Sequence, residues 1–390
     1  MNGCFVSHLE CALTGERHVG APPYGYSTAG APLLVRYDLD AVAGAVDKSM
    51  LAERPTGLWR YREFLPYPDR ADVVSLGEAT TPLVALPAIA RRLGGMNLMA
   101  KDEGGLPTGS FKARGMAIAI TMLKSFGVTD VAVPSAGNAG SAMAAYGARA
   151  GMRCSVFVPE DAPEVTNREA ALLGAKVYNV PGIIDACGRA MMETMPDDGW
   201  FDLSTLKEPY RIEGKKTMGL ELAEQGGWRL PDVIFYPTGG GTGLIGMWKA
   251  FAELREMGWL EGDLPRMVAV QTTGCAPIIK AFDAGLDEVP EPWENVDTEV
   301  HGVRVRKAFG DRLILSALYE SGGFAIAVDD REVHDMRIAC ARADGFHLCP
   351  EGTACLAAYA HAINDGRIAK SDRAVIFNSA NGLKSPIPVN

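Results

Sequence analysis

Residues 131–150 have the sequence Val-Ala-Val-Pro-Ser-Ala-Gly-Asn-Ala-Gly-Ser-Ala-Met-Ala-Ala-Tyr-Gly-Ala-Arg-Ala. This stretch predicts a strand, a glycine-bearing turn and an alanine-rich helix in immediate succession. The pattern continues on the C-terminal side, with strands expected at 154–158 and 176–180 and helices at 164–173 and 183–195. Strands that alternate with helices are typical of a parallel sheet covered by helices.

A second series of the same kind follows further along the chain. Helices are expected at 214–225 and 244–257, and strands at 233–236, 267–271 and 373–377. We therefore predict an α/β fold with two open parallel sheets covered by helices. Ligands in such sheets bind at the carboxyl ends of the strands.

The domain organisation follows from the two series. Residues 1–114 and 205–390 are expected to form a large domain that binds the cofactor, and residues 115–204 a small α/β domain. Within the large domain, residues 1–31 are rich in glycine, proline and tyrosine and are expected to be irregular.

Composition excludes several classes of protein. The 390 residues are 47% apolar and 22% charged, with a net charge of −10 and no basic cluster, so nucleic acid and membrane are poor partners. The chain shows no signal-peptide pattern, and its eight cysteines are scattered without a C-x-x-C pair. We expect a cytoplasmic protein without disulfides or metal.

Upstream, residues 101–115 read Lys-Asp-Glu-Gly-Gly-Leu-Pro-Thr-Gly-Ser-Phe-Lys-Ala-Arg-Gly. Ser110 stands at the N-cap position of a helix expected at 111–126, so Lys112 lies in the first turn. The positive character of a helix N-terminus lowers the pKa of a lysine there. Lys112 is therefore a candidate amine for a Schiff base, and the alternative is a solvated surface lysine.

Downstream, residues 237–243 read Pro-Thr-Gly-Gly-Gly-Thr-Gly between an expected strand and an expected helix. Consecutive glycines let backbone N–H groups converge on an anion, and the helix dipole adds to the attraction. Neither the P-loop lysine nor the spacing of a dinucleotide-binding motif is present. We predict a site for a single phosphate group; the alternative is a flexible strand–helix connection.

Two further loops follow strands. Residues 135–140 offer backbone amides to a carboxylate and the side chain of Asn138 to a ring oxygen, unless Ser135 and Asn138 only cap the helix. Residues 378–384, Asn-Ser-Ala-Asn-Gly-Leu-Lys, bring the hydroxyl of Ser379 to the end of the last strand.

A lysine for an imine, a glycine cradle for one phosphate, an asparagine and a hydroxyl together describe a pyridoxal 5'-phosphate site. The chain from residue 75 to the end also resembles the fold-type II (tryptophan synthase β-like) enzymes and, among them, the threonine synthase family. The motifs that carry the resemblance are Pro107-Thr-Gly-Ser-Phe-Lys-Ala-Arg-Gly, Ser135-Ala-Gly-Asn-Ala-Gly, Pro209-Tyr-Arg-Ile-Glu-Gly-Lys-Lys-Thr, Gly239-Gly-Gly-Thr-Gly, Pro350-Glu-Gly-Thr-Ala and Ser379-Ala-Asn-Gly-Leu-Lys.

The resemblance implies a role for each of these residues. Lys112 would form the Schiff base and move protons, and Phe111 would lie beside the cofactor ring. Asn138 would bond the ring O3′, and Ser379 the pyridine nitrogen, where a hydroxyl makes the ring a milder electron sink than a carboxylate does. The cofactor phosphate would lie against the glycine loop. The implied cofactor-binding residues are Phe111, Lys112, Asn138, Gly239, Gly240, Gly241, Thr242, Gly243 and Ser379.

In the threonine synthase family such a site converts O-phosphohomoserine and water into threonine and phosphate. Arg211 matches the arginine that binds the substrate phosphate, and a guanidinium fork suits that group. The alternative for Arg211 is a structural salt bridge. The implied substrate-binding residues are Ser135, Ala136, Gly137, Ala139 and Arg211.

Several positions depart from the family pattern. Ala136 and Ala139 lack hydroxyls that the family often carries, and Leu206 and Glu208 stand where asparagine and serine are common. These changes favour an alternative function, that of a threonine/serine-type dehydratase (ammonia-lyase) or a β-replacement enzyme. A non-catalytic protein that binds pyridoxal phosphate is a third hypothesis.

The N-terminus resembles a zinc ribbon that has lost its ligands. Cys11 is the only cysteine left at the four ligand positions, and Cys4 and His8 are not expected to replace the others. We therefore predict no metal. Analogy with the fold predicts a homodimer.

Overall fold

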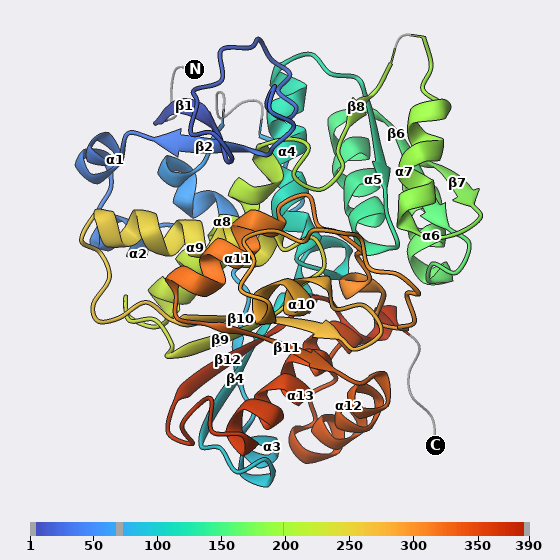
Figure 1. Cartoon of the computed structure of the whole chain (residues 1–390). Coiled ribbons are helices and arrows are strands. Elements are labelled where there is room, and N and C mark those ends of the chain that lie inside the picture. The colour runs from blue at the N-terminus through green and yellow to red at the C-terminus, as the bar shows by residue number, and fades with distance from the viewer. Residues whose placement is uncertain (1–4, 68–72, 198, 386–390) are drawn as a thin grey trace. The chain divides into compact units, whose positions relative to one another are not determined.

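The computed structural model describes residues 5–67, 73–197 and 199–385 (Figure 1). The chain divides into two compact units, which are described separately. The first comprises Met1–Thr80, Lys112–Met218 and Ala252–Trp259, and the second comprises Thr81–Phe111, Gly219–Phe251 and Leu260–Asn390. Cys4 lies outside the described residues.

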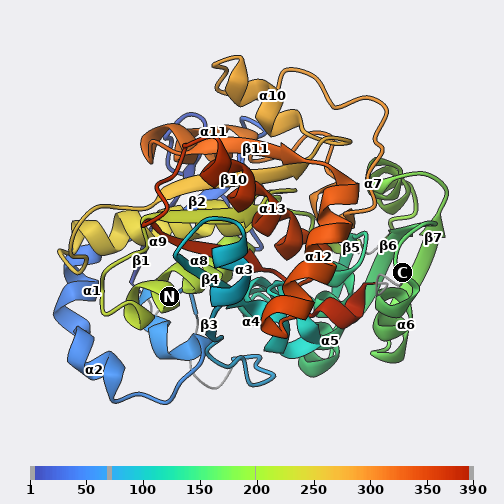
Figure 2. The same cartoon turned by 90° about the horizontal axis from the view of Figure 1, so that it is seen from below.

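The first unit contains a four-stranded parallel sheet in the order β7-β6-β5-β8. Helix α7 covers one face of it, and α5 and α6 cover the other (Figure 2). The sheet consists of β5 (Asp130–Pro134), β6 (Arg153–Pro159), β7 (Lys176–Val180) and β8 (Phe201–Asp202), and the helices are α5 (Asn138–Ala150), α6 (Glu164–Leu172) and α7 (Ile184–Glu193).

Aromatic and apolar side chains fix α7 on this sheet. Phe157 and Tyr178 stack from neighbouring strands with their ring centroids 4.4 Å apart. Cys187 and Met191 lie one helical turn apart on α7 and are both fully buried in the same cluster. Side chains four residues apart share one face of a helix, so this spacing directs the apolar stripe of α7 at the strands.

The rest of the first unit includes helix α4, of which residues 113–123 are all buried. An antiparallel pair, β1 with β2, precedes it in the chain. The expectation that residues 1–31 are irregular was wrong for residues 6–11, which form β1. The elements of this part are β1 (Val6–Cys11), β2 (Leu33–Tyr37), α1 (Leu39–Ala45), α2 (Lys48–Ala52), the 3-10 segment η1 (Leu58–Phe64), α4 (Lys112–Ser125) and the first part of α8 (Tyr210–Gln225).

The second unit contains a six-stranded sheet in the order β11-β10-β9-β12-β4-β3. Five strands are parallel, and β3 joins the edge in the antiparallel direction. All five residues of β9 are buried, as is typical of strands covered on both faces. The strands are β3 (Leu83–Ala85), β4 (Asn97–Asp102), β9 (Val233–Pro237), β10 (Arg266–Thr272), β11 (Phe324–Val328) and β12 (Arg373–Asn378).

Helices cover both faces of this sheet. In Figure 1, α3, α12 and α13 lie below the strands, and α10 and α11 lie above them. The buried side of α13 packs against four strands in the apolar core of this unit. The helices are α3 (Pro87–Arg92), α9 (Thr242–Glu256), α10 (Pro277–Asp283), α11 (Asp311–Glu320), α12 (Asp330–Asp344) and α13 (Pro350–Asn364), with short 3-10 segments η3 (Glu103–Gly105), η4 (Pro107–Gly109), η5 (His301–Val303) and η6 (Gly382–Lys384).

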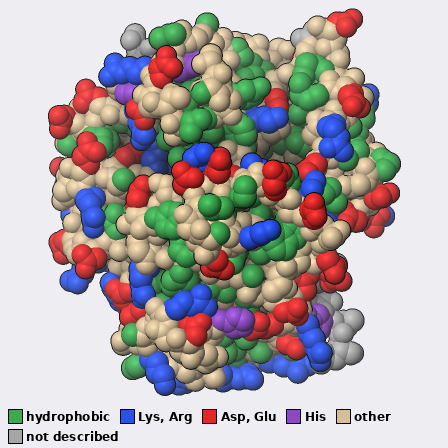
Figure 3. Space-filling model, viewed as in Figure 1, with side chains coloured by type: hydrophobic (Ala, Val, Ile, Leu, Met, Phe, Trp, Pro, Cys, Tyr) green, Lys and Arg blue, Asp and Glu red, His purple; other side chains and the backbone are tan. Residues whose placement is uncertain are grey.

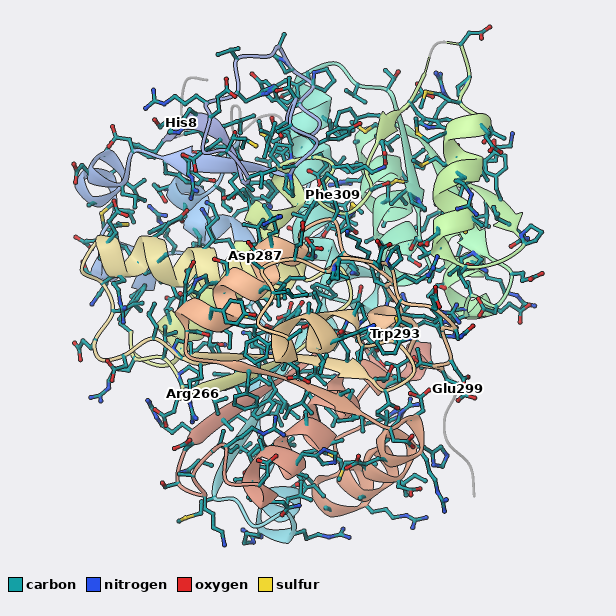
Figure 4. All side chains as sticks on the ribbon, viewed as in Figure 1. His8, Arg266, Asp287, Trp293, Glu299 and Phe309 are labelled. Carbon is teal, nitrogen blue, oxygen red and sulfur yellow. The ribbon has the colours of Figure 1, made fainter. Side chains whose placement is uncertain are left out.

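A long connection joins α10 to α11 and carries η5 toward the site described below. Trp293 and Glu299, labelled in Figure 4, mark its course. The carbonyl of Trp293 accepts a hydrogen bond from Arg306 Nε at 2.6 Å, and the backbone N–H of Glu299 donates to Asp330 Oδ2 at 2.6 Å. These bonds hold the connection in place although it contains little regular structure.

The predicted α/β fold with parallel sheets is confirmed. Three helices begin earlier than expected: α5 at Asn138 rather than Ser141, α8 at Tyr210 rather than Gly214, and α9 at Thr242 rather than Leu244. Their first turns carry glycine and polar residues, so apolar periodicity marks only the later turns. The strands of the smaller sheet all lie within residues 115–204, while the domain boundaries themselves stay a prediction.

The surface shows no large area of one charge on the face drawn in Figure 3, where acidic and basic side chains are interspersed. Among the helices of the described residues, none is both long and apolar enough to cross a membrane.

Candidate active site

In the second unit, three candidate loops follow three neighbouring parallel strands. Strand β12 lies between β9 and β4, so the carboxyl ends of all three meet at one edge of the sheet. The glycine loop follows β9, Ser379 follows β12, and residues 103–111 follow β4. The edge where three such ends meet is where ligands bind in open α/β sheets.

Backbone hydrogen bonds join the loop after β4 to the loop after β12. The N–H of Phe111 donates to the carbonyl of Ser379 at 3.0 Å, and the N–H of Asn381 donates to the carbonyl of Gly109 at 2.8 Å. Ser110 and Ala380 form an antiparallel bridge between them. Lys112 is the next residue after Phe111. The hydrogen bond from Phe111 to Ser379 therefore fixes the backbone directly before the lysine.

The sequence correctly places Lys112 in the first turn of a helix, because α4 begins at this residue. The expectation that Ser110 caps this helix was wrong. Ser110 is fully buried in extended backbone, and its Oγ has no hydrogen-bond partner among the described residues. The bridge to Ala380 fixes the extended conformation, so backbone pairing overrides the local preference of serine for capping.

The glycine loop packs so closely that side chains cannot replace its hydrogens. A Cβ on Gly239 would lie 2.4 Å from the carbonyl oxygen of Gly302 in η5. A Cβ on Gly243 would lie 1.9 Å from the hydroxyl oxygen of Tyr236. Gly241 has a φ of +71°, in the left-handed region that favours glycine. The loop therefore presents backbone rather than side chains to a ligand.

This loop fits the phosphate of the expected cofactor. It leads directly into α9, a helix of 15 residues whose first two are Thr242 and Gly243. Free N–H groups and the positive end of the dipole at such a helix start attract an anion. Phe111 lies in the same unit, where its ring meets that of Tyr236 edge to face at 6.2 Å between centroids.

The first unit brings together the remaining candidate residues. Strands β5 and β8 are parallel neighbours, so the loops after them lie at one edge of the smaller sheet. The loop after β5 contains Ser135, Ala136, Gly137, Asn138 and Ala139, and the loop after β8 leads to Arg211 at the start of α8.

In the loop after β5, the side chain of Ser135 stabilises the backbone. Its Oγ accepts the N–H groups of Gly137 at 3.1 Å and Gly140 at 2.9 Å, as a capping residue does. Asn138 does not cap; it is the first residue of α5. Its buried Oδ1 has no hydrogen-bond partner among the described residues. A buried amide end without a partner fits a residue that bonds a ligand, as expected for the cofactor ring.

Helices α4 and α8 cross at two glycines, Gly115 and Gly214, which have no side chains to separate the backbones. A Cβ on Gly214 would lie 2.0 Å from the carbonyl oxygen of Arg114, and a Cβ on Gly115 would lie 2.9 Å from that of Arg211. Lys112 is three residues before Gly115. The two glycines therefore place the starts of the two helices, with Lys112 and Arg211, close together in the same unit.

Arg211 is buried and held by its own loop. Its Nη1 donates to the carbonyl of Leu203 at 2.6 Å. Glu208 is also buried, and its Oε2 accepts the N–H groups of Tyr210 at 2.7 Å and Arg211 at 3.0 Å. Glu208 therefore occupies the first amides of α8. Between Leu203 and Glu208, Leu206 adopts a φ of +61°, a conformation that a leucine takes only under constraint.

Glu208 makes the stability of the protein depend on pH. Burial raises the pKa of its carboxyl from 4.5 to about 7, although Arg211 acts in the opposite direction. Burial likewise lowers the pKa of Arg211. A raised carboxyl pKa gives stability that is complete below pH 4.5 and is lost as the pH rises to about 7. At 1.36 kcal/mol for each pKa unit, the loss is about 3 kcal/mol.

We expect Glu208→Gln to remove this dependence, because an amide stays neutral in both folded and unfolded chains. The free energy of unfolding of the variant minus that of the parent should rise by about 2–3 kcal/mol between pH 5 and pH 8. Urea unfolding of the holoenzymes at both pH values measures it. A difference that is the same at both pH values would contradict the shifted pKa.

Three residues that shape the loops were not predicted from the sequence. Glu351 Oε1 accepts the N–H of Gly302 at 2.9 Å and so holds η5, on which Gly239 packs. Tyr236 lies under Gly243, and Cys349 contacts Ser379. Glu351 belongs to the Pro-Glu-Gly-Thr-Ala motif, which could have indicated its position but not its partner.

The described residues contain no group of three or more histidine, cysteine or acidic side chains that could hold a metal ion. Cys4 lies outside them, so the absence of a metal stays a prediction.

Comparisons with known proteins identify the family. The family model described as "Pyridoxal-phosphate dependent enzyme" matches residues 74–380, which include every candidate site residue. A threonine synthase of Methanocaldococcus jannaschii is 33% identical over 92% of this chain and 88% of its own length. One of Methanosarcina acetivorans is 32% identical over 97% and 92%.

The fold has solved counterparts. The structure of threonine deaminase isoform 2 from Solanum lycopersicum superposes with a TM-score of 0.65 and 22% identity, covering 84% of this chain and 91% of that one. This likeness shows the fold, and the family match confirms pyridoxal 5'-phosphate as the cofactor. The chain is a pyridoxal phosphate-dependent lyase that belongs to the threonine synthase family of fold-type II enzymes.

Proposed function

We propose that this enzyme is a threonine synthase that converts O-phosphohomoserine and water into threonine and phosphate. One observation carries the proposal. The relatives that match over 92% and 97% of this chain both bear that name, at 33% and 32% identity. The candidate residues support it, because each step of the reaction has a group suited to it.

Pyridoxal phosphate, when bound, withdraws electrons from the substrate and stabilises negative charge next to its α carbon. The protein supplies the remaining functions. The backbone of residues 239–243 would bind the cofactor phosphate, Asn138 the ring oxygen O3′, and Ser379 the pyridine nitrogen. Phe111 would lie beside the ring.

Lys112 would move the protons. Its Nζ would hold the cofactor before the substrate arrives, and then take a proton from the α carbon and one from the β carbon. After the γ phosphate leaves, the amine would deliver one proton to the γ carbon, water would add its hydroxyl to the β carbon, and the amine would return the other proton to the α carbon. The start of α4 favours the neutral amine that such proton transfer needs.

Arg211 would bind the γ phosphate of the substrate. A guanidinium carries five N–H donors, and Nη1 is the one bonded to Leu203, which fixes the direction of the group. Ala136 and Ala139 would contact the substrate carboxylate through their backbone N–H groups. Ser135 and Gly137 would line the same loop, since their own N–H groups donate to the Phe157 carbonyl and to Ser135 Oγ. The carboxyl of Glu208 is directed to amides of its own helix, and burial raises its pKa to about 7, so both effects lower its repulsion of an anionic substrate.

Glu208 also supports a second function, the conversion of an unphosphorylated amino acid. Because Glu208 fills the amides of Tyr210 and Arg211, those amides do not serve a substrate phosphate. Ala136 and Ala139 offer no hydroxyls to it either. An unphosphorylated substrate, as in a threonine or serine dehydratase or a β-replacement enzyme, would need neither.

Product analysis separates these functions. We expect threonine and one equivalent of phosphate from O-phosphohomoserine, and little 2-oxo acid from threonine or serine. Arg211→Lys should raise KM for O-phosphohomoserine by about tenfold, because lysine keeps the charge but not the fork. Release of 2-oxo acid and ammonia alone would establish the dehydratase. No turnover of any of these substrates would contradict both substrate assignments.

The proposal includes a homodimer in the cytoplasm. Sedimentation equilibrium of the holoenzyme would give twice the mass of the chain, and a monomer would contradict this part without affecting the reaction.

A further inference from the structure

A thiol lies next to the hydroxyl assigned to the pyridine nitrogen. Cys349 Sγ is 3.7 Å from Ser379 Oγ, within hydrogen-bond distance for sulfur, and either atom could be the donor. Cys349 is 1% exposed and Ser379 6% exposed, so both lie in the interior of the second unit. The thiol and the hydroxyl therefore hydrogen-bond to each other rather than to bulk water.

The position of Cys349 is fixed by its backbone and by helix α13. Cys349 is the N-cap of α13, and its Sγ accepts the N–H of Gly352 at 3.3 Å. Its own N–H donates to Asn378 Oδ1 at 2.9 Å, and Asn378 Nδ2 donates to Asp102 Oδ1 at 2.8 Å. The thiol is thus attached to the strands β12 and β4 that carry the site loops.

An arginine fixes the two loops that contain Cys349 and Ser379. Arg337, on α12, donates from Nε to the carbonyl of Leu348 at 3.0 Å and from Nη2 to the carbonyl of Gly382 at 2.8 Å. One side chain therefore spans both segments. The distance between the thiol and the hydroxyl is set by this bridge as well as by the strands.

The hydrogen bonds of Cys349 bear on the orientation of the Ser379 hydroxyl. Burial raises the pKa of the Cys349 thiol to about 12, so the sulfur keeps its proton at neutral pH. The sulfur accepts the N–H of Gly352, and its own proton can be donated to Ser379 Oγ, which lies 3.7 Å away. A serine hydroxyl has one donor and two acceptor positions. When it accepts from Cys349, its own proton is left for a different acceptor.

We propose that Cys349 is a positioning residue that turns the hydroxyl of Ser379 so that it donates to the pyridine nitrogen of pyridoxal phosphate. An unprotonated pyridine nitrogen is an acceptor, and the bond from Cys349 selects the orientation of Ser379 that serves it. The inference rests on the proposed role of Ser379. It does not depend on which amino acid the enzyme converts.

The test uses holoenzymes reconstituted with pyridoxal phosphate labelled with 15N in the ring. We expect Cys349→Val to move the 15N resonance in the same direction as Ser379→Ala. The dissociation constant of pyridoxal phosphate should rise by about threefold to tenfold, as for one lost hydrogen bond. Cys349→Ser should restore both values, because a hydroxyl can accept from Gly352 and donate to Ser379 as the thiol does.

A double variant distinguishes orientation from a general loss of structure. In the Ser379→Ala background, Cys349→Val should produce no further change in the 15N resonance, since no hydroxyl remains to be turned. Cys340→Val is the matched control, because Cys340 is a fully buried thiol of α12 in the same unit. It should leave the resonance and the dissociation constant unchanged.

Two outcomes would overturn the proposal. One is a change caused by Cys349→Val that is equally large with and without Ser379. The other is an unchanged resonance in Ser379→Ala, which would show that Ser379 does not contact the nitrogen. If the valine variant does not fold, Cys349→Ala provides the same comparison. Since no substrate is present, failure here is distinct from failure of the proposed reaction.

Discussion

Lys112→Ala is expected to lower threonine formation from O-phosphohomoserine by at least about a thousandfold, the range in which loss of a positioned proton-transfer group falls. The amine also attaches the cofactor, so the variant should lose the visible absorbance of the bound Schiff base. Phosphate release and the absorbance spectrum measure the two effects on the same sample. A change in both together would show that one amine serves both tasks.

Lys124 gives a matched control for this substitution. It lies in the last turn of the same helix α4 and is exposed. Lys124→Ala should leave activity and absorbance within a factor of two of the parent, because it removes the same group from the other end of the helix. Retained activity in Lys112→Ala would contradict the assignment of the catalytic lysine.

The second large effect concerns stability. Glu221→Ala should lower the free energy of unfolding by about 3–5 kcal/mol, because it removes a fully buried carboxylate that pairs with the buried ammonium of Lys101. Both side chains are completely buried, and Lys101 Nζ lies 2.9 Å from Glu221 Oε2. Lys101 also donates to the carbonyl of Thr81 and to Gln225 Oε1, each at 2.8 Å.

Urea unfolding at neutral pH tests this prediction, with an exposed ion pair as its control. Arg168 and Glu164 pair on α6 with 77% and 74% of their side chains exposed. Arg168→Ala should cost less than about 0.5 kcal/mol, as surface pairs do. Equal effects of the two substitutions would show that burial does not decide the strength of the first pair.

Sequence patterns predicted most of the fold because strands and helices alternate with clear apolar runs. Strand β7 has its predicted ends, and α4 begins at Lys112 within one residue of the prediction. Strand β1 was missed because its pairing with β2 is remote in sequence and its residues, Val-Ser-His-Leu-Glu-Cys, show only weak alternation. Pairing partners that are distant in the chain leave little trace in the local pattern.

Site residues were likewise predicted where the signal is local in sequence and missed where it depends on distant segments. Lys112, the glycine loop and Asn138 follow from turn chemistry and from motifs, which are local. Glu351 and Cys349 depend on contacts with η5 and Ser379, which lie 49 and 30 residues away. The capping role predicted for Ser110 was wrong for a similar reason, since the bridge to Ala380 joins segments far apart in sequence.

Strand order has a consequence for biosynthesis. β12 lies between β9 and β4 in the middle of the six-stranded sheet, yet it follows every other strand of that sheet in sequence. A nascent chain that has not yet released residues 373–381 from the ribosome lacks this central strand, and the hydrogen-bonding edges of β4 and β9 then have no neighbour. Unpaired edges of this kind promote aggregation. Chaperone protection is therefore most valuable before this strand emerges, and the loop that carries Ser379 can take its place only after β12 has inserted.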